Sequence, residues 1–214
     1  SQFGGMGIPI FKPRANNEEI IKRIKAAETA GAIAVGMDID AIVFKTMELK
    51  HQAVKPKSLT ELKSIISSTH LPFILKGIMN PRDAAMAVEA GAHAIVVSNH
   101  GGRVLDEMVG TMDVLEDIVR EVHGHIHILI DGGFRTGVDI LKALALGAEY
   151  VLIGRPVAIA AVGMGSEAVA YYLKSLQAEL KKAMILTGCA TIHDITGDIV
   201  RKIHHNSYQP LEVR

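Results

Sequence analysis

The segment 88–100, VEAGAHAIVVSNH, decides the fold class of this chain. It joins the end of an Ala-rich helix, a Gly-Ala stop, an apolar run and a polar end. The segments 28–38, ETAGAIAVGMD, and 144–156, LALGAEYVLIGRP, repeat this order. Glycine suits the left-handed position that closes a helix, and a short continuous apolar run suits a parallel strand covered on both faces. The three segments therefore predict repeated helix-to-strand units in a parallel sheet.

The same pattern extends over the whole chain of 214 residues. We expect strands at 7–11, 32–38, 72–77, 93–98, 127–131 and 149–153. Helical stretches fall at 17–30, 58–68, 80–90, 111–123, 135–146 and 165–187. Alternating strands and helices predict a parallel sheet with right-handed crossovers. The segment 38–57 is the one long connection, and no linker or change in composition divides 1–214 into two domains.

Polar groups at the strand ends favour a barrel over an open doubly wound sheet. Five consecutive strands end in Asp38, Lys76, His100, Asp131 and the pair Gly154-Arg155. An open sheet gathers its site near one switch point, whereas a barrel brings every strand end to one mouth. We therefore predict a TIM (β/α)8 barrel. The six strands correspond to strands 3 to 8, so two N-terminal strands are expected to be missing or to come from a partner.

Composition excludes several classes of partner. Lys and Arg number 23, as do Asp and Glu, so no nucleic acid or membrane surface is expected as a partner. A single cysteine, Cys189, fits a reducing, cytoplasmic location. No membrane span is expected, since no apolar run approaches the roughly 20 residues that one needs. His123, His125 and His127 alternate around a turn, and we expect no metal there.

The polar strand ends carry groups suited to acid–base chemistry. Lys76 follows three apolar residues, so its ammonium is expected to face a polar cavity. His100 could act as a general base, and Asp38 could hold its ring in one tautomer. Arg103 follows two glycines and could bind a carboxylate through its planar fork. The alternative is that SNHGGR (98–103) forms a polar turn and Lys76 snorkels at its strand end.

Two later segments predict a phosphate site. DGGFRTG (131–137) and IGRP (153–156) contain glycines that expose backbone N–H groups, a helix start, and the cations Arg135 and Arg155. Barrels frequently bind phosphate in the loops after their last two strands. The chain has neither a GxGxxG nor a GxxxxGK motif, which argues against a nicotinamide Rossmann site and a P-loop.

These motifs resemble a known family. IVVSNHGGRVLD, DGGFRTGVDILKALALGAEYVLIGRP and ELKKAMILTGC are similar to the FMN-dependent α-hydroxy acid dehydrogenase/oxidase family, and the resemblance runs from about 58 to 195. It implies that His100 takes the substrate proton, Asp38 pairs with its ring, Arg103 binds the substrate carboxylate and Lys76 stabilises reduced flavin. It also implies the FMN-binding residues Lys76, Ser98, His100, Gly101, Arg103, Asp131, Gly132, Gly133, Arg135, Gly154 and Arg155.

The substrate side departs from the family pattern. The segment FKPR places Lys12 and Arg14 where the family has Gln-x-Tyr, and Gly36 replaces a threonine. Lys45 is the nearest equivalent of a second substrate-binding arginine. We expect oxidation of a small L-2-hydroxy acid to the 2-keto acid, with oxygen, a quinone or a protein as acceptor, and a homo-oligomer such as a tetramer.

Two alternatives stay open. The first is other FMN-barrel chemistry, such as that of type 2 isopentenyl diphosphate isomerase, because extra cations would suit a more anionic substrate. The second is a flavin- or phosphate-binding barrel without catalysis.

Overall fold

Six parallel strands form one sheet whose spatial order is the order of the chain. The computed structural model describes residues 6–42, 47, 49, 51–122 and 124–201. The strands are β1 (Ile10–Phe11), β2 (Val35–Asp38), β3 (Phe73–Ile78), β4 (Ala94–Val97), β5 (His127–Ile130) and β6 (Tyr150–Val151). Every neighbouring pair is parallel. This order has no reversal, as in a barrel and unlike a doubly wound sheet. The six predicted strands are confirmed, and within the described residues they form an open arc.

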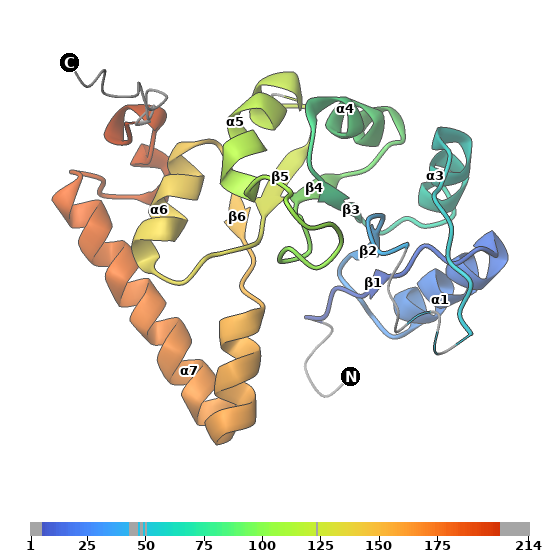
Figure 1. Cartoon of the computed structure of the whole chain (residues 1–214), viewed down its shortest axis with the longest axis horizontal. Helices are drawn as coiled ribbons and strands as arrows, with labels where there is room; N and C mark the ends of the chain where they lie inside the picture. Colours follow the sequence, from blue (N-terminus) through green and yellow to red (C-terminus); the bar gives the residue numbers. More distant parts are fainter. Residues whose placement is uncertain (1–5, 43–46, 48, 50, 123, 202–214) are drawn as a thin grey trace, which may run out of the picture.

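Helices follow the strands and lie around the outside of the arc (Figure 1). They are α1 (Asn17–Thr29), α3 (Leu59–Ile66), α4 (Pro81–Glu89), α5 (Thr111–Val122), α6 (Gly137–Ala145) and α7 (Arg155–Leu186), followed by the short 3-10 helices η1 (Ile192–Asp194) and η2 (Gly197–Ile199). Side-chain caps begin two of these helices: the Asn16 side chain accepts from the Glu18 N–H, and Ser58 and Glu61 form a capping box. These caps satisfy backbone donors that the first helical turn leaves unpaired.

Alternation along the strands separates two apolar layers. Phe73, Leu75 and Ile95 belong to the large cluster packed beneath the helices. Ile74 and Val96, each adjacent in sequence to at least one of these residues, belong to a second cluster on the opposite face of the sheet. Successive side chains of a strand point to opposite faces. Ile10, Gly36, Ile74, Val96 and Leu129 occupy positions of this second face along their strands. Because side chains alternate, the residues two positions further on share this face. They are the strand-end residues Lys12, Asp38, Lys76, Ser98 and Asp131.

Helix α7 begins earlier than its pattern predicts. The expected helix starts at 165, but the structure continues it back to Arg155 and interrupts it at Met164 and Gly165, which are not helical. Figure 1 shows the resulting bend between a short and a long helical segment. By length and composition alone, with a mean hydropathy of 1.2, α7 is the single described helix that could cross a membrane. The expected absence of a membrane span therefore stays a prediction.

Candidate active site

A cavity of about 560 Å³ opens at the carboxyl ends of the strands. Its volume falls in the range of ordinary small-ligand pockets, roughly 300–1,000 Å³. The residues that line it are Asp38, Lys76, His100, Gly101, Arg103, Asp131, Gly132, Gly133, Phe134, Arg135, Leu152, Ile153, Gly154, Arg155 and Ala158. Apart from Ser98, every residue for which the family resemblance implies FMN binding or catalysis lies on this cavity.

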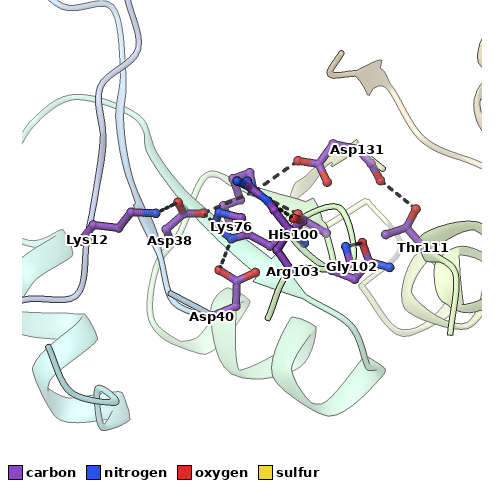
Figure 2. A network of polar contacts seen from close by, with 11 residues as sticks. Lys12, Asp38, Asp40, Lys76, His100, Gly102, Arg103, Thr111 and Asp131 are labelled. Atoms are coloured by element: carbon purple, nitrogen blue, oxygen red, sulfur yellow. Dashed lines mark hydrogen bonds and ion pairs between the residues drawn. The ribbon is translucent and has the colours of Figure 1, made fainter. Parts of the chain in front are cut away.

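Alternating charges connect the ends of β1, β2, β3 and β5 (Figure 2). The Lys12 ammonium lies 2.7 Å from Oδ2 of Asp38. The Lys76 ammonium lies 3.3 Å from Oδ1 of Asp38 and 3.2 Å from Oδ2 of Asp131, and it donates a 2.9 Å hydrogen bond to Ser98 Oγ. Lys76 is therefore held between two carboxylates, as a buried ammonium requires.

The Asp38 carboxylate stays ionised because of these lysines. Burial acts to raise its pKa, but the hydrogen bond from Lys12 and the charges of Lys76, Lys12 and His100 outweigh burial, so the pKa of Asp38 lies below its ordinary value. Asp38, Asp40 and His100 offer potential ligand atoms within 4.8 Å of one another. The two ammonium groups already neutralise Asp38, so this spacing does not by itself indicate a metal, and the absence of one stays a prediction.

His100 projects from a left-handed turn at the end of β4. Its φ is 57°, and Gly101 and Gly102 follow at 68° and 75°. Left-handed backbone is uncommon for residues other than glycine and occurs frequently at functional sites. The His100 N–H donates to Ser98 Oγ, which fixes the start of the turn. This geometry favours a functional site at His100 over the alternative of a simple polar turn.

The histidine ring contacts a carboxylate that sequence reasoning missed. Nδ1 of His100 lies 2.9 Å from Oδ1 of Asp40 and 4.0 Å from Oδ1 of Asp38. The predicted partner, Asp38, is therefore within ion-pair range but too distant for a hydrogen bond. The only sequence signal for Asp40 is a second aspartate two positions after the strand end, in a segment expected to be a loop.

Arg103 lies at the same cavity. Its Nε donates a 3.0 Å hydrogen bond to the backbone carbonyl of His100, which ties the guanidinium to the turn that carries the histidine. The residue is exposed overall. The predicted pairing of a base with a carboxylate-binding arginine is thus compatible with the geometry.

The predicted phosphate loops meet on the far side of the cavity. Gly132 and Gly133 adopt φ of 94° and 87°. Helix α7 begins after Gly154 without a side-chain cap, so its first N–H groups can serve an anion. The N–H groups just before α6 are not available to an anion in this way, because Asp139 accepts hydrogen bonds from those of Arg135 and Thr136. Of the two segments predicted to bind phosphate, the glycine turn at 131–133 and the start of α7 therefore keep backbone geometry suited to an anion, whereas the N–H groups before α6 are already paired.

The cations of the phosphate loops are tied to nearby carbonyls. Nη1 of Arg135 donates to Phe134 O at 2.8 Å. Nη2 of Arg155 lies 3.4 Å from Gly101 O, which connects the start of α7 to the His100 turn. Both arginines line the cavity.

Thr111 is a second residue that the sequence did not reveal. It lies at the start of α5, is 3% exposed, and donates a 2.7 Å hydrogen bond from Oγ1 to the backbone carbonyl of Asp131. This bond holds the glycine turn in place. Oδ1 of Asp131 is buried and accepts no hydrogen bond from the described residues, which suits a ligand hydroxyl as its donor.

Several predicted residues lie elsewhere. Ser98 is fully buried behind Lys76 and is absent from the cavity lining. Arg14 points toward α1, with Nη1 3.9 Å from Oε1 of Glu19. Lys45 and His123 fall outside the described residues. His127 pairs with Glu149 at 2.6 Å, at the opposite end of β5 from the cavity.

Comparison with known proteins agrees with this arrangement. The profile of FMN-dependent dehydrogenases matches residues 44–202. A peroxisomal (S)-2-hydroxyacid oxidase of Arabidopsis thaliana is 36% identical over 91% of this chain and 62% of its own length. An L-lactate oxidase of a Nostoc species is 50% identical over 63% of this chain and 37% of its own. A mandelate oxidase crystal structure superposes with a TM-score of 0.84 at 34% identity, covering 92% of this chain and 64% of that one.

The chain thus spans just over three fifths of the length of the Arabidopsis relative. The superposed mandelate oxidase identifies the open arc of six strands as part of an FMN-dependent TIM barrel. The matched profile and the similar relatives show that this chain belongs to the FMN-dependent dehydrogenase family.

Proposed function

We propose that the protein binds FMN and oxidises a small (S)-2-hydroxy acid, the L form, to the corresponding 2-keto acid. The observation that carries this proposal is one cavity that combines a carboxylate-held histidine, His100, with Arg103 and an uncapped helix start at Gly154. The names of the similar proteins, which include 2-hydroxyacid, lactate and mandelate oxidases, support the same reaction class.

The cavity residues suit FMN. Gly132, Gly133 and the start of α7 offer backbone donors, and Arg155 offers charge, for its phosphate. The buried Oδ1 of Asp131 would accept from a ribityl hydroxyl. Lys76 would place a positive charge beside the ring. When bound, FMN supplies the two-electron acceptor that the protein's own side chains lack.

The chain's own residues then account for substrate binding and the proton. Arg103 would bind the substrate carboxylate, and His100 would take the hydroxyl proton as the carbinol carbon becomes a ketone. Oxidation to the 2-keto acid removes two electrons and two hydrogens from the substrate, and FMN would be the group that accepts the electron pair. Removing the hydroxyl proton favours this step because it lets the C–O bond gain double-bond character.

The alternative of diphosphate chemistry is less well supported. In the sequence, a more anionic substrate is favoured by the extra cations Lys12, Arg14 and Lys45. The Lys12 ammonium pairs with Asp38, and Arg14 points toward Glu19 on α1. Neither adds to the positive charge available to a more anionic substrate. Lys45 is outside the described residues.

Anaerobic flavin reduction tests the proposal. The FMN-loaded protein should lose its absorbance near the visible flavin maximum when mixed with L-lactate, glycolate or L-mandelate, and D-lactate should leave it oxidised. His100→Ala should retain the flavin and lose the reduction. Failure of the wild-type protein to bind FMN, or full-speed reduction in His100→Ala, would overturn the proposal. Admitting oxygen or a quinone afterwards identifies the electron acceptor.

We further propose a cytoplasmic location and a homo-oligomer, with a tetramer as the expected form. The single buried cysteine, Cys189, supports a reducing compartment. Sedimentation of the purified protein measures the assembly, and microscopy of a tagged chain measures the location.

A further inference from the structure

We propose that Asp40 is the positioning residue for the base His100, and that Asp38, the carboxylate at the strand end, serves the lysines instead. This inference rests on the proposed function, since it assigns a role toward the proposed base. It concerns a residue in the turn after β2, which no sequence motif singled out.

Distance and burial favour Asp40 as the partner of the histidine. Oδ1 of Asp40 lies 2.9 Å from Nδ1 of His100, a normal hydrogen-bond length. The two side chains are only 12% and 10% exposed. An ion pair sheltered from water is weakened little by solvent screening. Asp38 is equally buried, but its nearer oxygen is 4.0 Å from the same nitrogen.

The distribution of charge explains why two aspartates are present. Lys12 and Lys76 both contact Asp38, at 2.7 and 3.3 Å, and Lys76 also contacts Asp131. A carboxylate neutralised by two ammonium groups has little negative potential left for an imidazolium. Asp40 has no lysine or arginine within ion-pair distance among the described residues, and its Oδ2 is buried without a hydrogen bond there. Its charge is therefore directed to His100.

The backbone after β2 places Asp40 next to His100. Strand pairing continues past β2, since the Ile39 N–H donates to the Lys76 carbonyl, and the chain then turns with Ala41 N–H donating to Asp38 O. The turn lays the Asp40 side chain over Gly77. A Cβ at position 77 would lie 2.7 Å from Cγ of Asp40, so only glycine permits this approach. Gly77 itself has a φ of 104°.

The chemical consequence concerns which ring nitrogen takes the proton. A carboxylate at Nδ1 favours the tautomer that carries its hydrogen on Nδ1, so Nε2 accepts the substrate proton. When the imidazolium forms, Asp40 stabilises its charge, as the aspartate does in catalytic triads. The charged groups around His100 are Asp38 and Asp40 from the β2 end, Lys76 on β3, which contacts Asp38, Arg103 on its own turn, and Arg155 at the start of α7, which contacts the Gly101 carbonyl.

The test compares Asp40→Asn with Asp38→Asn in the FMN-loaded protein. The imidazole ¹⁵N shifts of His100 report its tautomer without any turnover. We expect a single Nδ1–H form in the wild type and in Asp38→Asn, and a tautomer mixture in Asp40→Asn. We also expect Asp40→Asn to slow anaerobic flavin reduction about 10²-fold or more, and to move the rising limb of its pH profile to lower pH, because an imidazolium loses its nearest anion.

The outcomes separate this inference from the proposed function. If no hydroxy acid reduces the wild-type flavin, the proposed reaction fails, but the ¹⁵N shifts still decide which aspartate holds His100. A tautomer that changes in Asp38→Asn and not in Asp40→Asn would overturn the inference. Asp40→Glu restores the carboxylate and should recover the Nδ1–H form. Its recovery would show that Asp40→Asn lost the charge and not the fold.

Discussion

The Lys12 ammonium lies 2.7 Å from Oδ2 of Asp38 and joins the ends of two adjacent strands. Strand β1 contains only Ile10 and Phe11, so it makes few ladder hydrogen bonds. The ion pair is largely shielded, with the Lys12 side chain 31% and the Asp38 side chain 10% exposed. It therefore contributes both to attaching β1 to the sheet and to keeping Asp38 ionised at the floor of the cavity.

Replacing Lys12 by Met should destabilise the fold. A hydrogen bond to a charged partner contributes about 1.5–3 kcal/mol, and Asp38 would lose one of its two ammonium partners. We expect the free energy of unfolding at pH 7 to fall by about that amount, measured by urea denaturation. Lys22→Met, on the exposed face of α1, is the matched control and should change it by less than about 0.5 kcal/mol.

The same variant has a definite pH dependence. The pKa of Asp38 is lowered in the folded protein, so its contribution to stability is complete above the unfolded value of about 3.9. That contribution is lost as the pH falls through the lower folded pKa. The stability difference between wild type and Lys12→Met should therefore be largest near neutral pH and shrink below about pH 4. A difference that is constant between pH 3 and pH 7 would contradict the role of Asp38.

Gly77→Ala tests the close approach of Asp40. Any side chain at a φ of 104° carries strain of about 1–3 kcal/mol, and here the added Cβ also meets the Asp40 carboxyl carbon at 2.7 Å. Gly31→Ala separates the two costs, because Gly31 has a φ of 79° and no atom within 4 Å of an added Cβ. Gly77→Ala should be the more destabilising in urea denaturation. Equal effects would show that Asp40 moves aside freely.

Gly137→Ala should disrupt the contact between α6 and α7. The added Cβ would lie 2.1 Å from the backbone nitrogen of Leu180, and backbone cannot move aside as a flexible side chain can. Overpacking costs about 1–3 kcal/mol and here should reach the upper end of that range. Gly163→Ala adds a Cβ in open space and should be neutral or stabilising by up to about 1 kcal/mol. Thermal denaturation of both variants measures the contrast.

Arg155→Met tests the anion site at the start of α7. Loss of a charge-assisted contact should weaken FMN binding about 10-fold or more, measured by quenching of flavin fluorescence. Riboflavin, which lacks the phosphate, should bind the variant and the wild type equally. Arg120→Met, on the exposed surface of α5, should leave FMN affinity unchanged. Equal losses for FMN and riboflavin would place Arg155 outside the phosphate site.

Local sequence signals predicted much of the fold. The Gly-Ala stops, apolar runs and caps place the six strands and the starts of α1, α3 and α4, because these features depend on residues within a few positions of one another. Helix α7 shows the limit of such signals. Its first segment, 155–163, has no polar cap and no clear polar face, so its sequence did not distinguish a helix from a loop.

The sequence by itself determined which strand ends carry charge and which glycines bend the chain, since each follows from a residue's chemistry and its place in a short pattern. Only the tertiary structure decided how those charges pair. The parallel register sets Asp38 opposite Lys76, and the turn after β2 brings Asp40 over Gly77 to His100. Pairing depends on distances of a few ångströms between residues up to 60 positions apart, and Coulombic and hydrogen-bond energies change steeply over such distances.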